Sequence, residues 1–234
     1  MEASLDTNII IHLYNANLQE LLFNRFTRLV AYEFIRDHEL KNHADNRVLS
    51  LFDQDVVSGK IHIVTDKELR AKKILKIFES HVYNQRILYD STDLGEVYAI
   101  SLAKTLGCIS LVTDDIKIRG PHYTLMRTPD SDVMPFAFHE LLLLDYLEGV
   151  LDINGFVNCF QKINEVSGLN WNVTSKLKDF LKRFWIDPYS TKEKEWMRSF
   201  CDDRKIEAKT KLFELKEHIT KTREMNELLE KHTV

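Results

Sequence analysis

The 234-residue sequence contains little cysteine and no large excess of either charge. Its three cysteines, Cys108, Cys159 and Cys201, form no CxxC pair, which argues against a disulfide framework and against a structural zinc site. The formal net charge is -4, so the net charge does not indicate a nucleic-acid binder. A protein with this net charge can still have a local basic groove. The nine histidines form no HxxxH or H-x-E array, and we interpret none of them as a metal ligand.

Motifs of several enzyme classes are also absent. No GxGxxG, P-loop or nucleophile elbow occurs, which argues against dinucleotide, NTP and serine-hydrolase sites. No basic-then-apolar leader precedes the first predicted strand, and the longest apolar run, around Leu141 to Leu144, is too short to span a bilayer. We therefore expect a cytoplasmic protein that does not associate with membranes.

Short apolar strands alternate with helices over about the first 125 residues. The predicted strands cover residues 3–5, 29–31, 61–65, 108–113 and 123–126. The predicted helices between them include residues 18–26, 34–42 and 66–83. This alternation predicts parallel crossovers, and hence an α/β domain with a central, mainly parallel sheet.

Beyond Pro129 the sequence predicts helices only. Those helices cover residues 136–150, 155–167 and 174–185, the last with Ser175 as its cap. A tail with balanced positive and negative charges follows Asp187, and its thin apolar stripe consists of Leu212, Leu215, Ile219 and Leu229. We expect three parts: a domain over residues 1–128, a helical extension over 129–186 and a charged helical tail over 187–234.

Carboxylates recur where predicted strands end and helices begin. Asp6 follows the first strand, Glu96 opens a helix of small and apolar residues, and Asp114 and Asp115 follow the strand over 108–113. Ligands of parallel sheets sit outside the carboxyl ends of the strands, and Mg²⁺ and Mn²⁺ prefer carboxylate oxygens. Because divalent ions can activate water and neutralise phosphate charge, the pattern predicts a metal site for phosphodiester hydrolysis.

These residues resemble the PIN domain. The resemblance rests on Asp6-Thr7-Asn8, on Gly95-Glu96 with the apolar helix behind it, and on Val112-Thr113-Asp114-Asp115. A helix with this GE start followed by a strand ending in DD is most similar to a branch of prokaryotic PIN-like proteins. The similarity covers about residues 3–127 and implies a PIN-like α/β/α sandwich with metal-dependent nuclease activity, often on RNA.

The resemblance also implies a set of site residues. Asp6, Glu96 and Asp115 match three of the family's acids, and Asp114 is an auxiliary metal ligand. Asp37 is selected as the remaining catalytic acid, with Glu33 and Glu39 as open alternatives. The residues expected to position water or orient ligands are Thr7, Asn8 and Thr113, and Arg119 is expected to bind a substrate phosphate.

The function implied is that of an endoribonuclease using Mg²⁺ or Mn²⁺. Its setting would be the toxin of a toxin–antitoxin pair, with an antitoxin covering the acidic pocket and a homodimer as one expected assembly. Two alternatives stay open. One is a DNA-directed nuclease of a defence or mobile-element system, and the other is a non-catalytic PIN-like scaffold that binds a protein partner.

Overall fold

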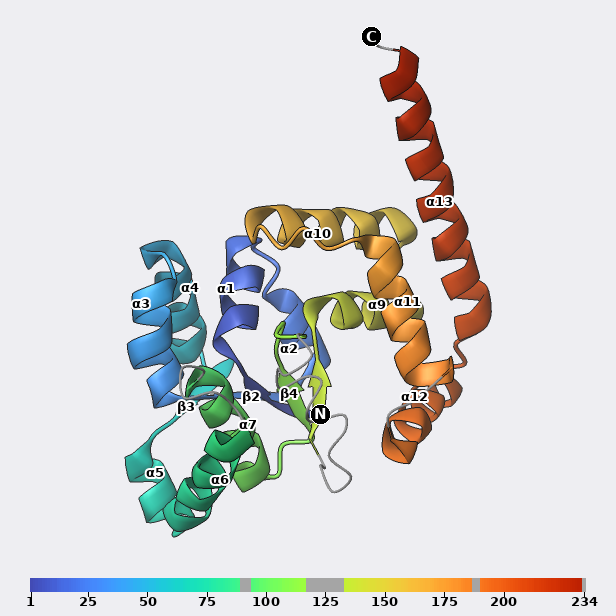
Figure 1. The fold of residues 1–234 in the computed structure, drawn as a ribbon. Helices are drawn as coiled ribbons and strands as arrows, with labels where there is room; N and C mark the ends of the chain where they lie inside the picture. The colour runs from blue at the N-terminus through green and yellow to red at the C-terminus, as the bar shows by residue number, and fades with distance from the viewer. Residues whose placement is uncertain (89–93, 117–132, 187–189, 233–234) are drawn as a thin grey trace. The chain divides into compact units, whose positions relative to one another are not determined.

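The computed structural model describes residues 1–88, 94–116, 133–186 and 190–232 and divides into two compact units, Met1–Leu141 and Leu142–Val234 (Figure 1). The first unit is an α/β sandwich with a parallel central sheet, and the second is helical. The predicted fold class is therefore confirmed. Among the described residues, no helix is both long and apolar enough to cross a membrane.

A five-stranded parallel sheet with the order β3-β2-β1-β4-β5 organises the first unit. Its strands are β1 (Glu2–Leu5), β2 (Arg28–Tyr32), β3 (Ile61–Val64), β4 (Ser110–Val112) and β5 (Met134–Phe136). From β1 the chain proceeds to β2 and β3 on one side, whereas β4 and β5 continue the sheet on the other. The order therefore reverses between β1 and β4, and parallel α/β sheets bind ligands at such a reversal.

Helices of the first unit follow the strands on both sides of this reversal (Figure 1). They are α1 (Thr7–Asn15), α2 (Glu20–Arg25), the π-helix η1 (Ile35–Leu40), α3 (Lys41–His43), α4 (Asn46–Val57), α5 (Asp66–Ala71), α6 (Leu75–Leu88), α7 (Leu94–Leu106) and the first residues of α9 (Phe138–Glu148). Helix α7 packs against β1, β2 and β4. Its residues from Gly95 to Ala103 are buried except for the half-buried Tyr98, because its side chains are small or apolar on nearly every face.

The single helix predicted over residues 66–83 is wrong, because α5 and α6 are separate. Lys73 has a φ of +61°, which ends α5 in a left-handed residue. Lys73 N–H donates to Arg70 O, and Ile74 N–H donates to Leu69 O, both at 2.9 Å. These two bonds form a Schellman motif, which usually has glycine at the left-handed position. Because lysine occupies that position here, the sequence gives no sign of the break, and the apolar spacing predicts one continuous helix.

Strand β5 was not predicted, and the helix expected from Phe136 begins at Phe138. Pro135 at the centre of β5 pairs with Leu111 of β4, and proline argues against a central strand. The strand is nevertheless compatible with proline because it lies at the sheet edge, where one backbone side needs no partner. The strand predicted over residues 123–126 lies outside the described residues.

The second unit consists of the rest of α9 together with α10 (Ile153–Val166), α11 (Val173–Leu181), the π-helix η2 (Lys182–Ile186), α12 (Thr191–Asp203) and α13 (Ala208–His232). The predicted cap Ser175 is wrong. Asn172 caps α11 by accepting a hydrogen bond from Ser175 N–H at 3.0 Å. Leu212, Leu215 and Ile219 of the predicted apolar stripe are buried, as expected for one packed face of a charged helix.

Candidate active site

Two acids meet at the sheet edge where the strand order reverses. Asp6 directly follows β1, and its backbone N–H donates to Val112 O at 3.0 Å, which extends the pairing of β1 with β4. The Thr113 hydroxyl donates to Asp6 Oδ2 at 2.8 Å and accepts from Asp115 N–H at 3.2 Å. One hydroxyl therefore connects an acid from β1 to the acid that follows β4.

The Asp6 carboxyl group is strongly perturbed by its surroundings. Its residue is 2% exposed, and this burial, with the charges of Asp115 and Asp114, raises its pKa to about 6. Hydrogen bonds from the Thr113 side chain and the Thr7 backbone act in the opposite direction. Asp6 occupies the N-cap position of α1, but its side chain makes no cap hydrogen bond. The Thr113 hydroxyl thus holds the Asp6 carboxylate at the sheet edge.

We expect the stability of the metal-free protein to fall as pH rises through about 6. The pKa of Asp6 is higher in the folded protein than the ordinary aspartate value of 3.8, so the unfolded chain ionises first. The stabilising contribution of the neutral carboxyl is complete below about pH 4 and is lost above about pH 6, a loss of about 3 kcal/mol. Asp6→Asn removes this loss. Thermal unfolding in EDTA should show that the variant gains most over the parent chain at about pH 8.

A constant difference in melting temperature between the two proteins from about pH 5 to about pH 8 would contradict this assignment. Asp115→Asn provides a second comparison, because it should lower the pKa of Asp6 by removing a neighbouring negative charge. That variant should therefore shift the transition to lower pH without abolishing it.

Asp114 and Asp115 have different surroundings despite their adjacency. Asp114 is 6% exposed. Its Oδ2 lies 2.7 Å from His12 Nδ1, and its Oδ1 accepts from Phe138 N–H at 2.8 Å. Both oxygens thus tie α1 and the start of α9 to the end of β4, which favours a structural role over that of auxiliary metal ligand. No motif in the sequence singled out His12 as the partner of this acid.

The first turn of α7 approaches α1 and η1 closely at Gly95. A Cβ at this position would lie 3.2 Å from Thr7 Oγ1 and 3.4 Å from Glu39 Cδ, so only glycine fits without displacement. Glu96, the next residue, is 6% exposed. The Thr7 hydroxyl is buried and makes no hydrogen bond within the described part of the chain, which makes it an available donor and acceptor beside the acids.

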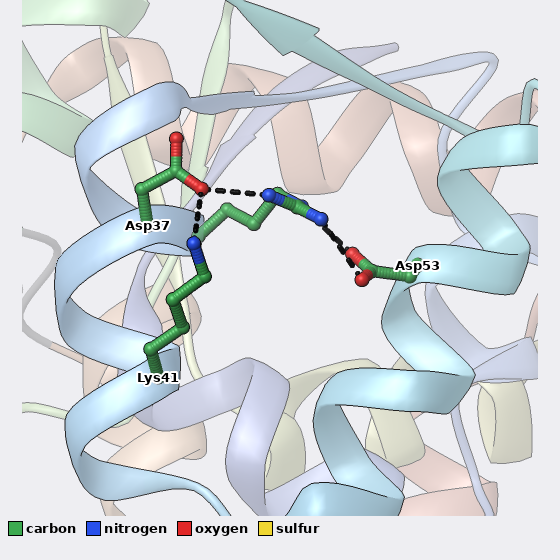
Figure 2. A network of polar contacts seen from close by, with 4 residues as sticks. Asp37, Lys41 and Asp53 are labelled. Atoms are coloured by element: carbon green, nitrogen blue, oxygen red, sulfur yellow. Dashed lines mark hydrogen bonds and ion pairs between the residues drawn. The ribbon is translucent and has the colours of Figure 1, made fainter.

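Of the three candidates for the remaining acid, Glu39 is the one beside Gly95. Asp37 Oδ1 accepts from Arg36 Nη1 at 2.6 Å and from Lys41 Nζ at 3.1 Å. Figure 2 shows this network, in which the Arg36 guanidinium also binds Asp53. Glu33 instead accepts the backbone N–H of Asp66 at 2.9 Å. The geometry therefore favours Glu39 over the selected Asp37.

The π-helix η1 orients its acids differently from an α-helix. Its hydrogen bonds run from i to i+5, so each turn contains more residues than an α-helical turn, and later side chains rotate relative to α-helical spacing. Asp37 and Glu39 both lie within η1. Apolar spacing in the sequence gives no signal for such a turn, whereas the structure places the Glu39 side chain against α7.

Asn8 is exposed, and Arg119 lies outside the described residues. Within the described ranges, no three His, Cys, Asp or Glu side chains are grouped so that they could hold a metal ion. The oxygen donors at the β1–β4 edge nevertheless suit Mg²⁺, which proteins commonly bind through one or two carboxylates together with waters and substrate phosphates. Comparisons of the chain with protein-family models, with curated proteins and with solved structures find no match.

Proposed function

We propose that the first unit is a divalent-metal-dependent nuclease that hydrolyses RNA. The observation that carries this proposal is the Thr113 hydroxyl, which connects Asp6 Oδ2 and Asp115 N–H at the reversal of strand order. Carboxylates of like charge in a buried setting are costly unless a cation or protons compensate them. The raised pKa of Asp6 expresses this cost in the metal-free protein.

Each residue has a distinct part in the proposed reaction. Asp6 and Asp115 would hold the ion, and Thr113 keeps their backbone segments in register. When bound, Mg²⁺ or Mn²⁺ would polarise a water and neutralise charge on the scissile phosphate. Glu39 and Glu96 would orient that water, and the buried Thr7 hydroxyl would donate to it or accept from it.

The direct test is a cleavage assay with single-stranded RNA, double-stranded RNA and DNA substrates in Mg²⁺, Mn²⁺ or EDTA. We expect cleavage in the presence of either ion and none in EDTA. Cleavage of DNA alone would instead support the DNA-directed alternative. Absence of metal-dependent cleavage on every substrate would remove the nuclease proposal and favour the scaffold.

A matched pair of variants tests the choice of Glu39. Glu39→Gln should lower kcat/KM by roughly 10- to 100-fold, because it removes a carboxylate beside Gly95 at the start of α7. Asp37→Asn makes the same chemical change two residues away, in a partly exposed ion pair with Lys41 and Arg36. It should change stability by less than about 1 kcal/mol and leave cleavage intact. Equal losses in both variants would contradict the assignment.

The toxin–antitoxin setting is a proposal that rests on the PIN resemblance. If it is correct, expression of the chain should arrest growth of a bacterial host, and Asp6→Asn should relieve that arrest. Growth unaffected by the active protein would argue against a toxin while leaving the nuclease proposal to the cleavage assay.

A further inference from the structure

A pocket of about 340 Å³ in the first unit is lined by residues of α5, α6, α7 and the end of β2. Aromatic rings form much of its wall. Tyr32 lies 4.7 Å from Phe78 and 5.0 Å from Tyr98 between ring centroids. Tyr83, 69% exposed, and the exposed Arg86 lie at its rim. Its size is within the range of small-ligand sites.

The pocket also contains polar groups that can read an edge of a flat ligand. Asp66 lines it and has a fixed position, because its Oδ1 accepts from the Tyr32 hydroxyl at 2.7 Å and its N–H donates to Glu33. Glu79 provides a second carboxylate, and the Arg86 guanidinium a donor. Flat aromatic walls with a few acceptors and one cation suit a nucleobase with exocyclic amines and an adjoining phosphate.

A row of ring contacts extends from the pocket to His38, the residue before Glu39. Tyr98 lies three residues after Gly95 on α7, so both face the same side of the helix. Its ring is 4.8 Å from that of Phe34, which stacks on His38 at 4.7 Å. His38 directly precedes Glu39, whose side chain lies against Gly95. Tyr32 ends β2, the neighbour of β1, at the same sheet edge as Asp6.

We propose that this pocket receives an unpaired nucleobase of the substrate, and that the site therefore selects single-stranded nucleic acid. The proposal rests on the proposed nuclease function and names its substrate class. A base in a duplex is stacked and paired, so it cannot enter a pocket between two helices without leaving the helix. A strand whose base occupies the pocket would pass its backbone along the ring row toward Asp6.

The test measures equilibrium binding in EDTA, where the proposed hydrolysis cannot occur. The probes are short, unstructured, end-labelled RNA and DNA oligonucleotides, the same strands with one abasic position at a time, and the corresponding duplexes. The variants are Tyr83→Ala and Arg86→Glu, both on exposed residues of the pocket rim. Lys76→Glu is the matched control, because it reverses an exposed charge on the same helix outside the pocket.

We expect one abasic position to weaken binding to the parent chain about tenfold, the value of one lost stacking interaction. The same abasic position should have little further effect in Tyr83→Ala, and Tyr83→Phe should retain parental affinity because the ring is kept. Arg86→Glu should weaken binding more than Lys76→Glu. The duplexes should bind at least tenfold more weakly than the single strands.

Equal binding of intact and abasic strands, equal binding of duplexes, or equal effects of Arg86→Glu and Lys76→Glu would overturn the proposal. Failure of the nuclease proposal has a different signature. If an abasic position weakens binding in a way that depends on Tyr83 but no substrate is cleaved, the nucleobase pocket is supported and the nuclease proposal is contradicted. Cleavage without abasic sensitivity would remove the pocket and leave the nuclease.

Discussion

Asp6→Asn should lower kcat/KM for RNA cleavage by at least about 100-fold, which corresponds to about 2.7 kcal/mol of lost transition-state stabilisation. The amide can still accept the hydrogen bond that Thr113 Oγ1 donates at 2.8 Å, so the local structure should be kept. What the variant loses is the negative charge at the β1–β4 edge. Cleavage kinetics at saturating Mg²⁺ and circular dichroism of both proteins provide the measurement.

The same substitution should stabilise the metal-free protein above about pH 6, since it removes a carboxylate whose ionisation is opposed by burial and by neighbouring acids. Activity and stability should thus change in opposite directions. Mg²⁺ should raise the melting temperature of the parent chain more than that of the variant. Parental cleavage rates in Asp6→Asn would remove the proposed site, whatever the change in stability.

Arg183→Met should destabilise the second unit by about 3–5 kcal/mol, which is the usual cost of removing one partner of a buried ion pair. Arg183 Nη2 donates to Glu193 Oε1 at 2.6 Å, and the side chains are only 3% and 5% exposed. The substitution leaves the Glu193 carboxylate buried without its guanidinium. Chemical denaturation can be followed by tryptophan fluorescence, because all three tryptophans, Trp171, Trp185 and Trp196, lie in the second unit.

Two further variants distinguish loss of the pair from loss of packing. Arg183→Met combined with Glu193→Leu replaces the pair by apolar groups and should recover most of the lost stability. Arg198→Met breaks an exposed pair with Asp202 on the same helix as Glu193 and should cost less than about 1 kcal/mol. A loss in Arg198→Met equal to that in Arg183→Met would contradict the assigned importance of burial.

Hydrophobic patterning predicted the fold wherever local preference and tertiary packing agree. Strands β1 to β4 consist of short apolar or alternating segments followed by turn or cap residues, and their positions are confirmed within a few residues. Strand β5 depends on its place at the sheet edge, which makes Pro135 acceptable, and sequence spacing does not reveal that place. The break at Lys73 likewise depends on a left-handed conformation in a residue that seldom adopts it.

The candidate site was predictable for the acids that follow strands and less so for those on helices. Asp6 and Asp115 are brought together by strand pairing, which the α/β pattern implies. The side of η1 on which Glu39 lies depends on a π-helical turn, and Asp37 is engaged by Arg36 and Lys41 instead. The partnership of His12 with Asp114 spans 102 residues, and neither residue's local sequence indicates it.

The bond between the Thr113 hydroxyl and Asp6 joins positions 107 residues apart. Contacts of such long sequence separation are slow to form, because the intervening chain must first be closed into a loop. A ribosome makes Asp6 early, but a nascent chain that stops before Ser110 has neither β4 nor the second acid. Asp6 and Asp115 can therefore come together only after nearly half of the chain has been synthesised. The proposed nuclease activity cannot begin before that point in translation.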